Sequence, residues 1–307
     1  TKPGHKTTTN TAKFLASHSG RYWALQHALQ SMSTTPPNGT CIDCVPRGHL
    51  VTLEAVRRVR RTHRLANLWG PRHTSSQPAP MIALQQVYHR LFERFGPQHW
   101  WPGDSPLEVV VGAVLVQNTN WNNVKKAIAN LREANLLDPQ SLVEIPAEEL
   151  EERIRPAGYF RVKARRLQNL MRFLVDRYGG SLEAMFQSPP DELRQALLSV
   201  NGVGPETADS ILLYAGGMAV FVVDAYTYRV LTRHGWIDEE ADYHLMQETF
   251  QSQLVSDAAL YNEYHALLVR LGKEYCRKRP KCSGCPLQDM LPPGGPHGVG
   301  GDDESFC

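Results

Sequence analysis

The stretch Leu197–Ala208, which reads LLSVNGVGPETA, decides the fold of this chain. An apolar helix end runs into a Gly-Val-Gly turn, and a proline stands at the first turn of the helix that follows. Glycine permits such a tight turn, and proline is well tolerated at a helix start. Free N–H groups at the start of the second helix favour a bound phosphate. The pattern therefore predicts two helices joined by a hairpin that can hold a phosphate.

Helix-length segments separated by glycine and proline follow one another from Met81 onward. Apolar residues recur at helical spacing in IALQQVYHRLFERF, RVKARRLQNLMRFLVDRY and PDELRQALLSV. The run LEVVVGAVLVQ fits a buried strand or a buried helix, because periodicity does not separate the two. Strand pairs with turn signals between them are scarce. We therefore predict an all-α fold.

Residues 1–80 differ in composition from the rest of the chain. They hold eleven lysines and arginines against two acidic residues, a balance of +9, whereas residues 81–307 have a balance of −7. Thr, Ser, Pro and Gly recur in residues 1–80 without helical or strand periodicity. We expect a disordered or non-native upstream extension, with a basic DNA-binding arm as the alternative. Any contact between the acidic remainder and phosphate requires a locally basic surface.

The overall composition is that of a soluble globular protein, with 42% hydrophobic and 21% charged residues. No apolar run reaches the roughly 18 residues of a membrane span, and no secretory signal is recognisable. The 231 residues from 45 to 275 contain no cysteine, which argues against a disulfide scaffold. We expect a cytoplasmic setting and no membrane partner.

An aspartate, Asp224, follows the glycine turn by about twenty residues in AVFVVDAYTYRVLTRHG. With SPLEVVVGAVLVQNT, AGYFRVKARRLQNL and a terminal cysteine cluster, the chain resembles the helix-hairpin-helix (HhH-GPD) superfamily of DNA glycosylases, to which endonuclease III belongs. The resemblance covers about residues 82–290. It implies two helical lobes with DNA bound in the cleft between them. Residues 105–215, with the hairpin at about 193–215, form one lobe; residues 81–104 and 216–290 form the cysteine-cluster lobe, and 291–307 a flexible tail.

Asp224 suits cleavage of the bond between base and sugar. That cleavage builds positive charge on the sugar, and a nearby carboxylate stabilises the charge or activates water. A helix N-cap is the structural alternative for this residue. Endonuclease III carries a lysine two residues after the glycine turn, where its amine forms a Schiff base, and this chain has Glu206 there. A carboxylate cannot form an imine, so we expect a glycosylase without strand-cleaving lyase activity.

The segment GVGPETAD most resembles the endonuclease-III-like branch that removes 3-methyladenine. The resemblance implies a base pocket in which aromatic faces stack on a flipped, cationic base, formed by Trp100, Trp101, Trp121 and Glu206. Core packing is the alternative for the tryptophans. The resemblance also gives Gln117 as the wedge that fills the gap left by the flipped base, with a surface glutamine as the alternative. The further DNA-binding residues that it implies are Lys163, Gly202, Val203, Gly204 and Thr207.

The cysteines near the end of the chain, Cys276, Cys282 and Cys285, resemble the family's [4Fe-4S] loop. The family pattern has six residues in the first gap and five residues between the third and the fourth cysteine. This chain has five residues in that gap and Leu291 at the fourth place, which leaves Cys307 as the candidate fourth ligand. We expect a structural [4Fe-4S] cluster, with zinc or no metal as alternatives.

The resemblance implies base excision repair of double-stranded DNA that contains a damaged base, here an alkylated purine. We expect a monomeric, bacterial-type, nucleoid-associated enzyme. A thymine or uracil mismatch glycosylase and an endonuclease III-like glycosylase/AP lyase are alternatives within the same enzyme class. A non-catalytic helix-hairpin-helix DNA-binding module is the alternative from another class. The joint presence of Asp224 and Gln117 argues against that module, since gripping phosphate requires neither residue.

Overall fold

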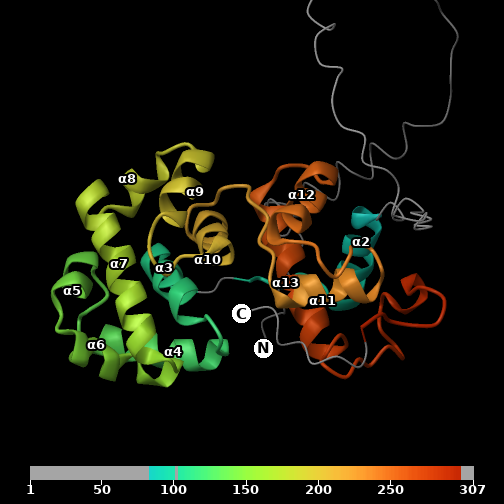
Figure 1. The fold of residues 1–307 in the computed structure, drawn as a ribbon, viewed down its shortest axis with the longest axis horizontal. Coiled ribbons are helices and arrows are strands. Elements are labelled where there is room, and N and C mark those ends of the chain that lie inside the picture. Colours follow the sequence, from blue (N-terminus) through green and yellow to red (C-terminus); the bar gives the residue numbers. More distant parts are fainter. Residues whose placement is uncertain (1–82, 101–102, 299–307) are drawn as a thin grey trace, which may run out of the picture. The chain divides into compact units, whose positions relative to one another are not determined.

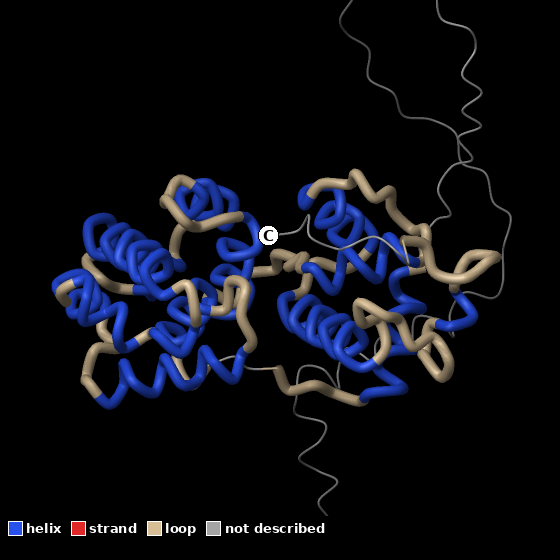
Figure 2. Tube along the Cα trace, turned by 60° about the horizontal axis from the view of Figure 1, so that its bottom comes forward, coloured by secondary structure: helices blue, strands red, loops and turns tan. Residues whose placement is uncertain are grey.

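The computed structural model describes residues 83–100 and 103–298. The chain divides after Pro78, and all described residues belong to the second unit. The extension expected at residues 1–80, Trp101 and Cys307 lie outside the described residues. Within the described ranges the regular elements are helices and none is a strand, so the all-α prediction is confirmed (Figures 1 and 2). None of these helices is both long and apolar enough to cross a membrane.

The second unit contains α-helices and shorter helical turns. Three of them are single turns: the 3-10 turns η2 (Arg155–Ala157) and η4 (Gln288–Met290), and the π-helical turn η3 (Ile211–Ala215), which continues α10. The α-helices in chain order are α2 (Leu84–Phe95), α3 (Pro106–Leu115), α4 (Trp121–Glu133), α5 (Pro139–Glu144), α6 (Ala147–Arg153), α7 (Phe160–Tyr178), α8 (Leu182–Phe186), α9 (Pro190–Leu198), α10 (Pro205–Ser210), α11 (Ala225–Arg233), α12 (Tyr243–Gln253) and α13 (Ala258–Glu274).

The ambiguous run LEVVVGAVLVQ forms most of a helix, α3. Ser105 caps it by accepting a hydrogen bond from the Glu108 amide at 3.3 Å, and Pro106 occupies its first turn. Both features favour a helix start over a strand. Its residues from Glu108 to Leu115 are all buried, so α3 is enclosed by the helices around it.

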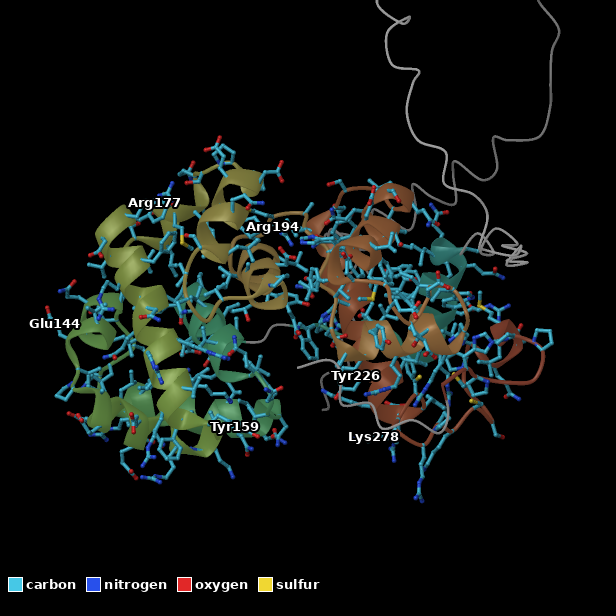
Figure 3. All side chains as sticks on the ribbon, viewed as in Figure 1. Glu144, Tyr159, Arg177, Arg194, Tyr226 and Lys278 are labelled. Atoms are coloured by element: carbon cyan, nitrogen blue, oxygen red, sulfur yellow. The ribbon has the colours of Figure 1, made fainter. Side chains whose placement is uncertain are left out.

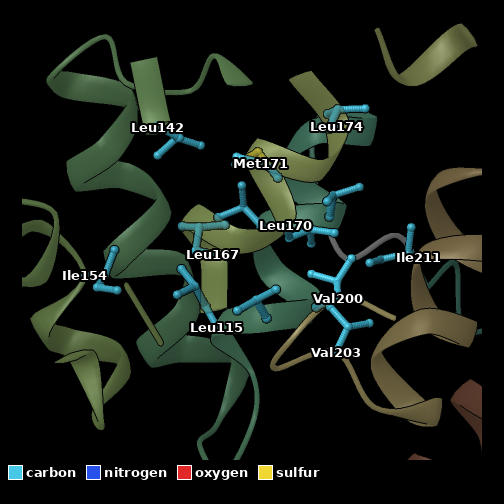
Figure 4. Packing of buried hydrophobic residues seen from close by; sticks show 14 of the residues in the cluster. Leu115, Leu142, Ile154, Leu167, Leu170, Met171, Leu174, Val200, Val203 and Ile211 are labelled. Carbon is cyan, nitrogen blue, oxygen red and sulfur yellow. The ribbon is translucent and has the colours of Figure 1, made fainter. Parts of the chain in front are cut away.

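Helices α3 to α10 and the turn η3 pack around one continuous apolar core, which we call the helical lobe (Figure 4). Leu115 and Leu167 lie in this core, and the hairpin contributes Val200 and Val203 to it. Helices α2, α11, α12 and α13 form a second group, which we call the cysteine lobe (Figure 1). Its core includes Phe221 and Phe250, whose rings stack with centroids 4.0 Å apart.

A buried carboxylate, Asp209 on α10, joins the helical lobe to α12. It is fully buried and accepts two hydrogen bonds from the guanidinium of Arg194 on α9, at 2.6 and 3.0 Å. From α12, the Tyr243 hydroxyl donates to it at 2.8 Å and the Gln247 amide at 2.7 Å. A buried charge with this many donors is stabilised as long as all of them stay in place. Arg194 is labelled in Figure 3.

Candidate active site

The hairpin between α9 and α10 requires glycine at Gly202. Its φ is 99°, and a Cβ there would lie 2.2 Å from Cγ of Arg166. Gly204 is the N-cap of α10 and is exposed, and a Cβ there would meet nothing within 4 Å. Val203 lies between these two glycines, and its expected contact with DNA stays a prediction. Its side chain is buried in the helical-lobe core, and its N–H already donates to the Val200 carbonyl at 3.0 Å.

The carboxylate of Asp224 has two differently engaged oxygens. Oδ1 caps α11, accepting hydrogen bonds from the Thr227 amide at 2.8 Å and the Thr227 hydroxyl at 2.9 Å. Oδ2 lies 3.5 Å from Nε2 of His265 on α13. Burial alone raises the pKa of Asp224, but the charge and hydrogen bond of His265 and the two bonds from Thr227 outweigh it and lower that pKa below its ordinary value. Asp224 is therefore an N-cap and, at neutral pH, an ionised carboxylate.

Glu206, at the second position of α10, is electrostatically coupled to Asp224. Removal of its carboxyl group from bulk water and the nearby Asp224 charge raise the pKa of Glu206 to about 7, against a smaller opposing effect of His265. Glu206 as a whole residue is nevertheless exposed to solvent. Two neighbouring carboxyl groups whose pKa values are pushed apart are the arrangement used to cleave glycosidic bonds.

Two further residues, Tyr214 and His265, complete the site and were not expected from the sequence. The Tyr214 hydroxyl, on η3, makes a hydrogen bond with Nδ1 of His265. Burial, followed by the charges of Asp224 and Glu206, raises the pKa of Tyr214 well above its ordinary value. Each residue is a polar group within an apolar helical run, ILLYA and HALLV, and that is the signal that could have found them.

Comparisons with known proteins decide the family. Residues 111–254 match the family model described as HhH-GPD superfamily base excision DNA repair protein. The protein MJ1434 of Methanocaldococcus jannaschii, provisionally named a DNA repair glycosylase, is 46% identical over 209 residues, covering 67% of this chain and 94% of that protein. This chain belongs to the HhH-GPD superfamily. Endonuclease III of Thermotoga maritima is 28% identical over 67% of this chain and 91% of its own length.

Solved HhH-GPD structures agree with this assignment. A trapped covalent complex of endonuclease III with DNA has a TM-score of 0.60 at 27% identity, covering 68% of this chain and 96% of that one. The 3-methyladenine DNA glycosylase of H. pylori, bound to 1,N6-ethenoadenine, has a TM-score of 0.56 at 29% identity, covering 63% and 98%. The protein is thus a DNA-binding, endonuclease III-related DNA N-glycosylase of base excision repair, as the motifs predicted.

In this HhH-GPD protein Gln117 is held against the hairpin. Its Nε2 donates to the Gly202 carbonyl at 3.2 Å and to the Thr207 hydroxyl at 2.9 Å, and its Oε1 accepts a hydrogen bond from Arg166. Insertion of Gln117 into DNA would break these contacts and stays a prediction. Thr207 is buried and its hydroxyl accepts a hydrogen bond from Gln117, so its role in DNA binding also stays a prediction.

Lys163, which was also expected to contact DNA, is anchored inside the protein. Its side chain is 2% exposed, and its ammonium donates to the Ala157 carbonyl at 2.7 Å. Burial, with a smaller effect of the Arg166 charge, lowers the pKa of Lys163 to about 8. In the described structure this side chain braces the start of α7, and its contact with DNA stays a prediction.

The described tryptophans pack within the HhH-GPD fold. The ring of Trp121 lies so close to α3 that a Cβ on Gly112 would be 2.8 Å from it, and Trp121 packs against the helical-lobe core. This packing agrees with the alternative of core packing, and the place of Trp121 in the base pocket stays a prediction. Trp100 lies beside α13, with its ring centroid 5.6 Å from the Lys273 ammonium. Its base-pocket role stays a prediction.

Three thiols of the cysteine lobe, Cys276, Cys282 and Cys285, line one pocket with an empty volume of about 330 Å³, part of it open to solvent. Arg233 donates to the sulfur of Cys276 at 3.4 Å. Burial raises the pKa of Cys276 and raises that of Cys285 to about 11. Leu291 lines the same pocket. Within the described residues, no group of three or more His, Cys, Asp or Glu is arranged to grip a single metal ion. Three thiols and Leu291 thus line the same pocket, and the cluster stays a prediction.

Proposed function

We propose that this protein is a monofunctional, monomeric DNA glycosylase that removes an alkylated purine from double-stranded DNA and leaves the strand uncut. The observation that supports this most is Glu206, a carboxyl group beside Asp224 at the position where endonuclease III has its Schiff-base lysine. Covalent catalysis of strand cleavage needs an amine there. With a carboxylate, hydrolysis of the base–sugar bond remains as the available reaction.

Asp224 would act on the sugar. The bond between C1′ and the base nitrogen breaks, the base leaves with the electron pair, and positive charge builds up on the sugar. The ionised Asp224 stabilises that charge, most effectively in a site that excludes water. A water molecule then adds to C1′ and gives up a proton. Glu206, whose pKa is about 7, can accept that proton at neutral pH, because a good fraction of it is ionised there.

An alkylated purine is the substrate class that best suits a site with two acidic groups. Alkylation at a ring nitrogen makes the base cationic and weakens its bond to the sugar, so no strong acid is needed to help the base leave. A cation is also attracted by the two carboxyl groups of Asp224 and Glu206. The H. pylori relative is named a 3-methyladenine DNA glycosylase, which supports the same class.

A panel of duplexes with one lesion each tests this proposal. The panel contains 3-methyladenine, 1,N6-ethenoadenine, thymine glycol, and thymine or uracil opposite guanine, and base release is measured directly. We expect the alkylated purines to be released fastest. Preferred release of mismatched thymine or uracil would instead support a mismatch glycosylase. Release of no base, despite DNA binding, would support a non-catalytic module.

We further propose that Cys276, Cys282 and Cys285 hold a structural [4Fe-4S] cluster, which would fix the shape of the loop and take no part in base chemistry. Anaerobically purified protein should then be brown and contain about four iron atoms per chain. The variant Leu291→Cys supplies a thiolate at the fourth place and should slow the loss of iron in air. Cys307→Ser should speed that loss only if Cys307 is the fourth ligand. Less than about one iron per chain in both the wild type and Leu291→Cys would contradict the cluster.

A further inference from the structure

We propose that His265, held by Tyr214, is a positioning residue that orients Asp224 and keeps it ionised during base excision. The inference rests on the proposed role of Asp224 in that reaction. The three residues come from different parts of the fold: Tyr214 from η3 of the helical lobe, His265 from the middle of α13, and Asp224 from the start of α11. Two direct contacts link them into a chain.

The Nε2 side of the His265 imidazole faces the Asp224 carboxylate. His265 is buried, and Nδ1 is engaged with the Tyr214 hydroxyl. Among the described residues, buried Nε2 has no partner at ordinary hydrogen-bond length, and Oδ2 of Asp224, at 3.5 Å, is the acceptor that it faces. Oδ1 of Asp224 is already committed to Thr227. The contact to His265 therefore acts on Oδ2, the oxygen of Asp224 that remains for base excision.

His265 presents an N–H to Asp224 whether its imidazole is neutral or charged. Burial and the nearby negative charges keep Tyr214 protonated, so its hydroxyl can donate to Nδ1 of a neutral His265. The ring proton then lies on Nε2, because the hydrogen bond at one ring nitrogen fixes the tautomer. A charged His265 carries protons on both nitrogens. In both cases an N–H faces the carboxylate.

This donor keeps the pKa of Asp224 below that of Glu206, so that the two carboxyl groups do not compete for one proton. The titratable groups that face His265 are Asp224, Tyr214 and, at longer range, Glu206. On the side of α2, which also packs on α13, Tyr88 meets Tyr264. Without the His265 N–H, the pKa of Asp224 would rise, and a larger fraction of Asp224 would be protonated and inactive in mildly acidic solution.

The test compares His265→Leu with His265→Gln in single-turnover excision from about pH 5.5 to about pH 8.5. This range extends to both sides of the Glu206 pKa of about 7. Leucine removes the donor, whereas the glutamine amide can place an N–H near the position of Nε2. We expect His265→Leu to lose excision by about tenfold or more at the acidic end and much less at the alkaline end. His265→Gln should regain most of the rate. Tyr214→Phe should shift the acidic limb in the same direction by a smaller amount.

Tyr264→Phe is the matched control, because it also removes a buried hydroxyl, one that donates to the Leu84 carbonyl at 2.9 Å from the same helix α13. It should lower the melting temperature without moving the pH profile. An unmoved pH profile in His265→Leu would overturn the inference, as would equal slowing of the Leu and Gln variants at every pH. Should His265→Leu fail to fold, Tyr214→Phe decides in the same way. A wild type that releases no base refutes the proposed function instead.

Discussion

Base excision by Asp224→Asn is expected to be about two to four orders of magnitude slower than by the wild type. The amide is neutral and cannot stabilise the positive charge that develops on the sugar. It is nearly isosteric with the carboxylate, and asparagine is as good a helix N-cap as aspartate. The hydrogen bonds from Thr227 can therefore persist, so that the loss reports on chemistry and not on folding. Single-turnover excision with enzyme in excess measures it.

A matched control for this substitution is Asp242→Asn. Asp242 caps α12, accepting a hydrogen bond from the Leu245 amide at 2.8 Å, and is exposed. The same chemical change there should leave excision unaltered. Binding of damaged DNA should also change little in Asp224→Asn, because the hairpin is intact. Undiminished excision by Asp224→Asn would remove Asp224 from the mechanism.

The largest expected loss of stability is that of Asp209→Ala, at about 3–5 kcal/mol. The substitution leaves the Arg194 guanidinium in a largely buried place without its counter-ion, and it removes the acceptor of Tyr243 and Gln247. Unpaired buried donors are costly because water cannot replace the lost acceptor. Equilibrium urea unfolding at neutral pH measures the change.

The control for this prediction is Glu149→Ala. Glu149 pairs with Arg153 one turn away on α6, at 3.2 Å, and both side chains are over 40% exposed. Exposed pairs of this kind contribute about 0–1 kcal/mol. If Asp209→Ala destabilised the protein no more than Glu149→Ala, the Asp209 network would not be an essential connection between the helical lobe and α12.

The local patterns predicted much of the fold. The glycine turn and Pro205 predicted the hairpin, and helical periodicity predicted the all-α class. The run that became α3 stayed ambiguous because a fully buried helix is apolar on every face, so its periodicity carries no signal. Its cap at Ser105 and Pro106 held the missing information.

The site was harder to predict because its partners are distant in the sequence. His265 lies 51 residues after Tyr214, and only the packing of α13 against η3 brings them together. For two further residues, burial is the property that the sequence did not predict. Lys163 and Thr207 have side chains that suit DNA, but each is used inside the protein. Sequence spacing places a residue on an element, but it does not say whether that face meets solvent or another helix.

The most direct test of the proposed monofunctional glycosylase uses an end-labelled duplex with one alkylated purine, incubated with the wild-type protein and then divided into three portions. One portion is analysed directly, one after hot alkali, and one after incubation with borohydride. An endonuclease III on its own substrate serves as the positive control, because its covalent complex with DNA has been trapped. With Glu206 in place of the lysine, we expect an intact strand before alkali, a cut at the lesion after alkali, and no borohydride-linked protein–DNA adduct. A cut strand without alkali, together with an efficiently trapped adduct, would contradict this function.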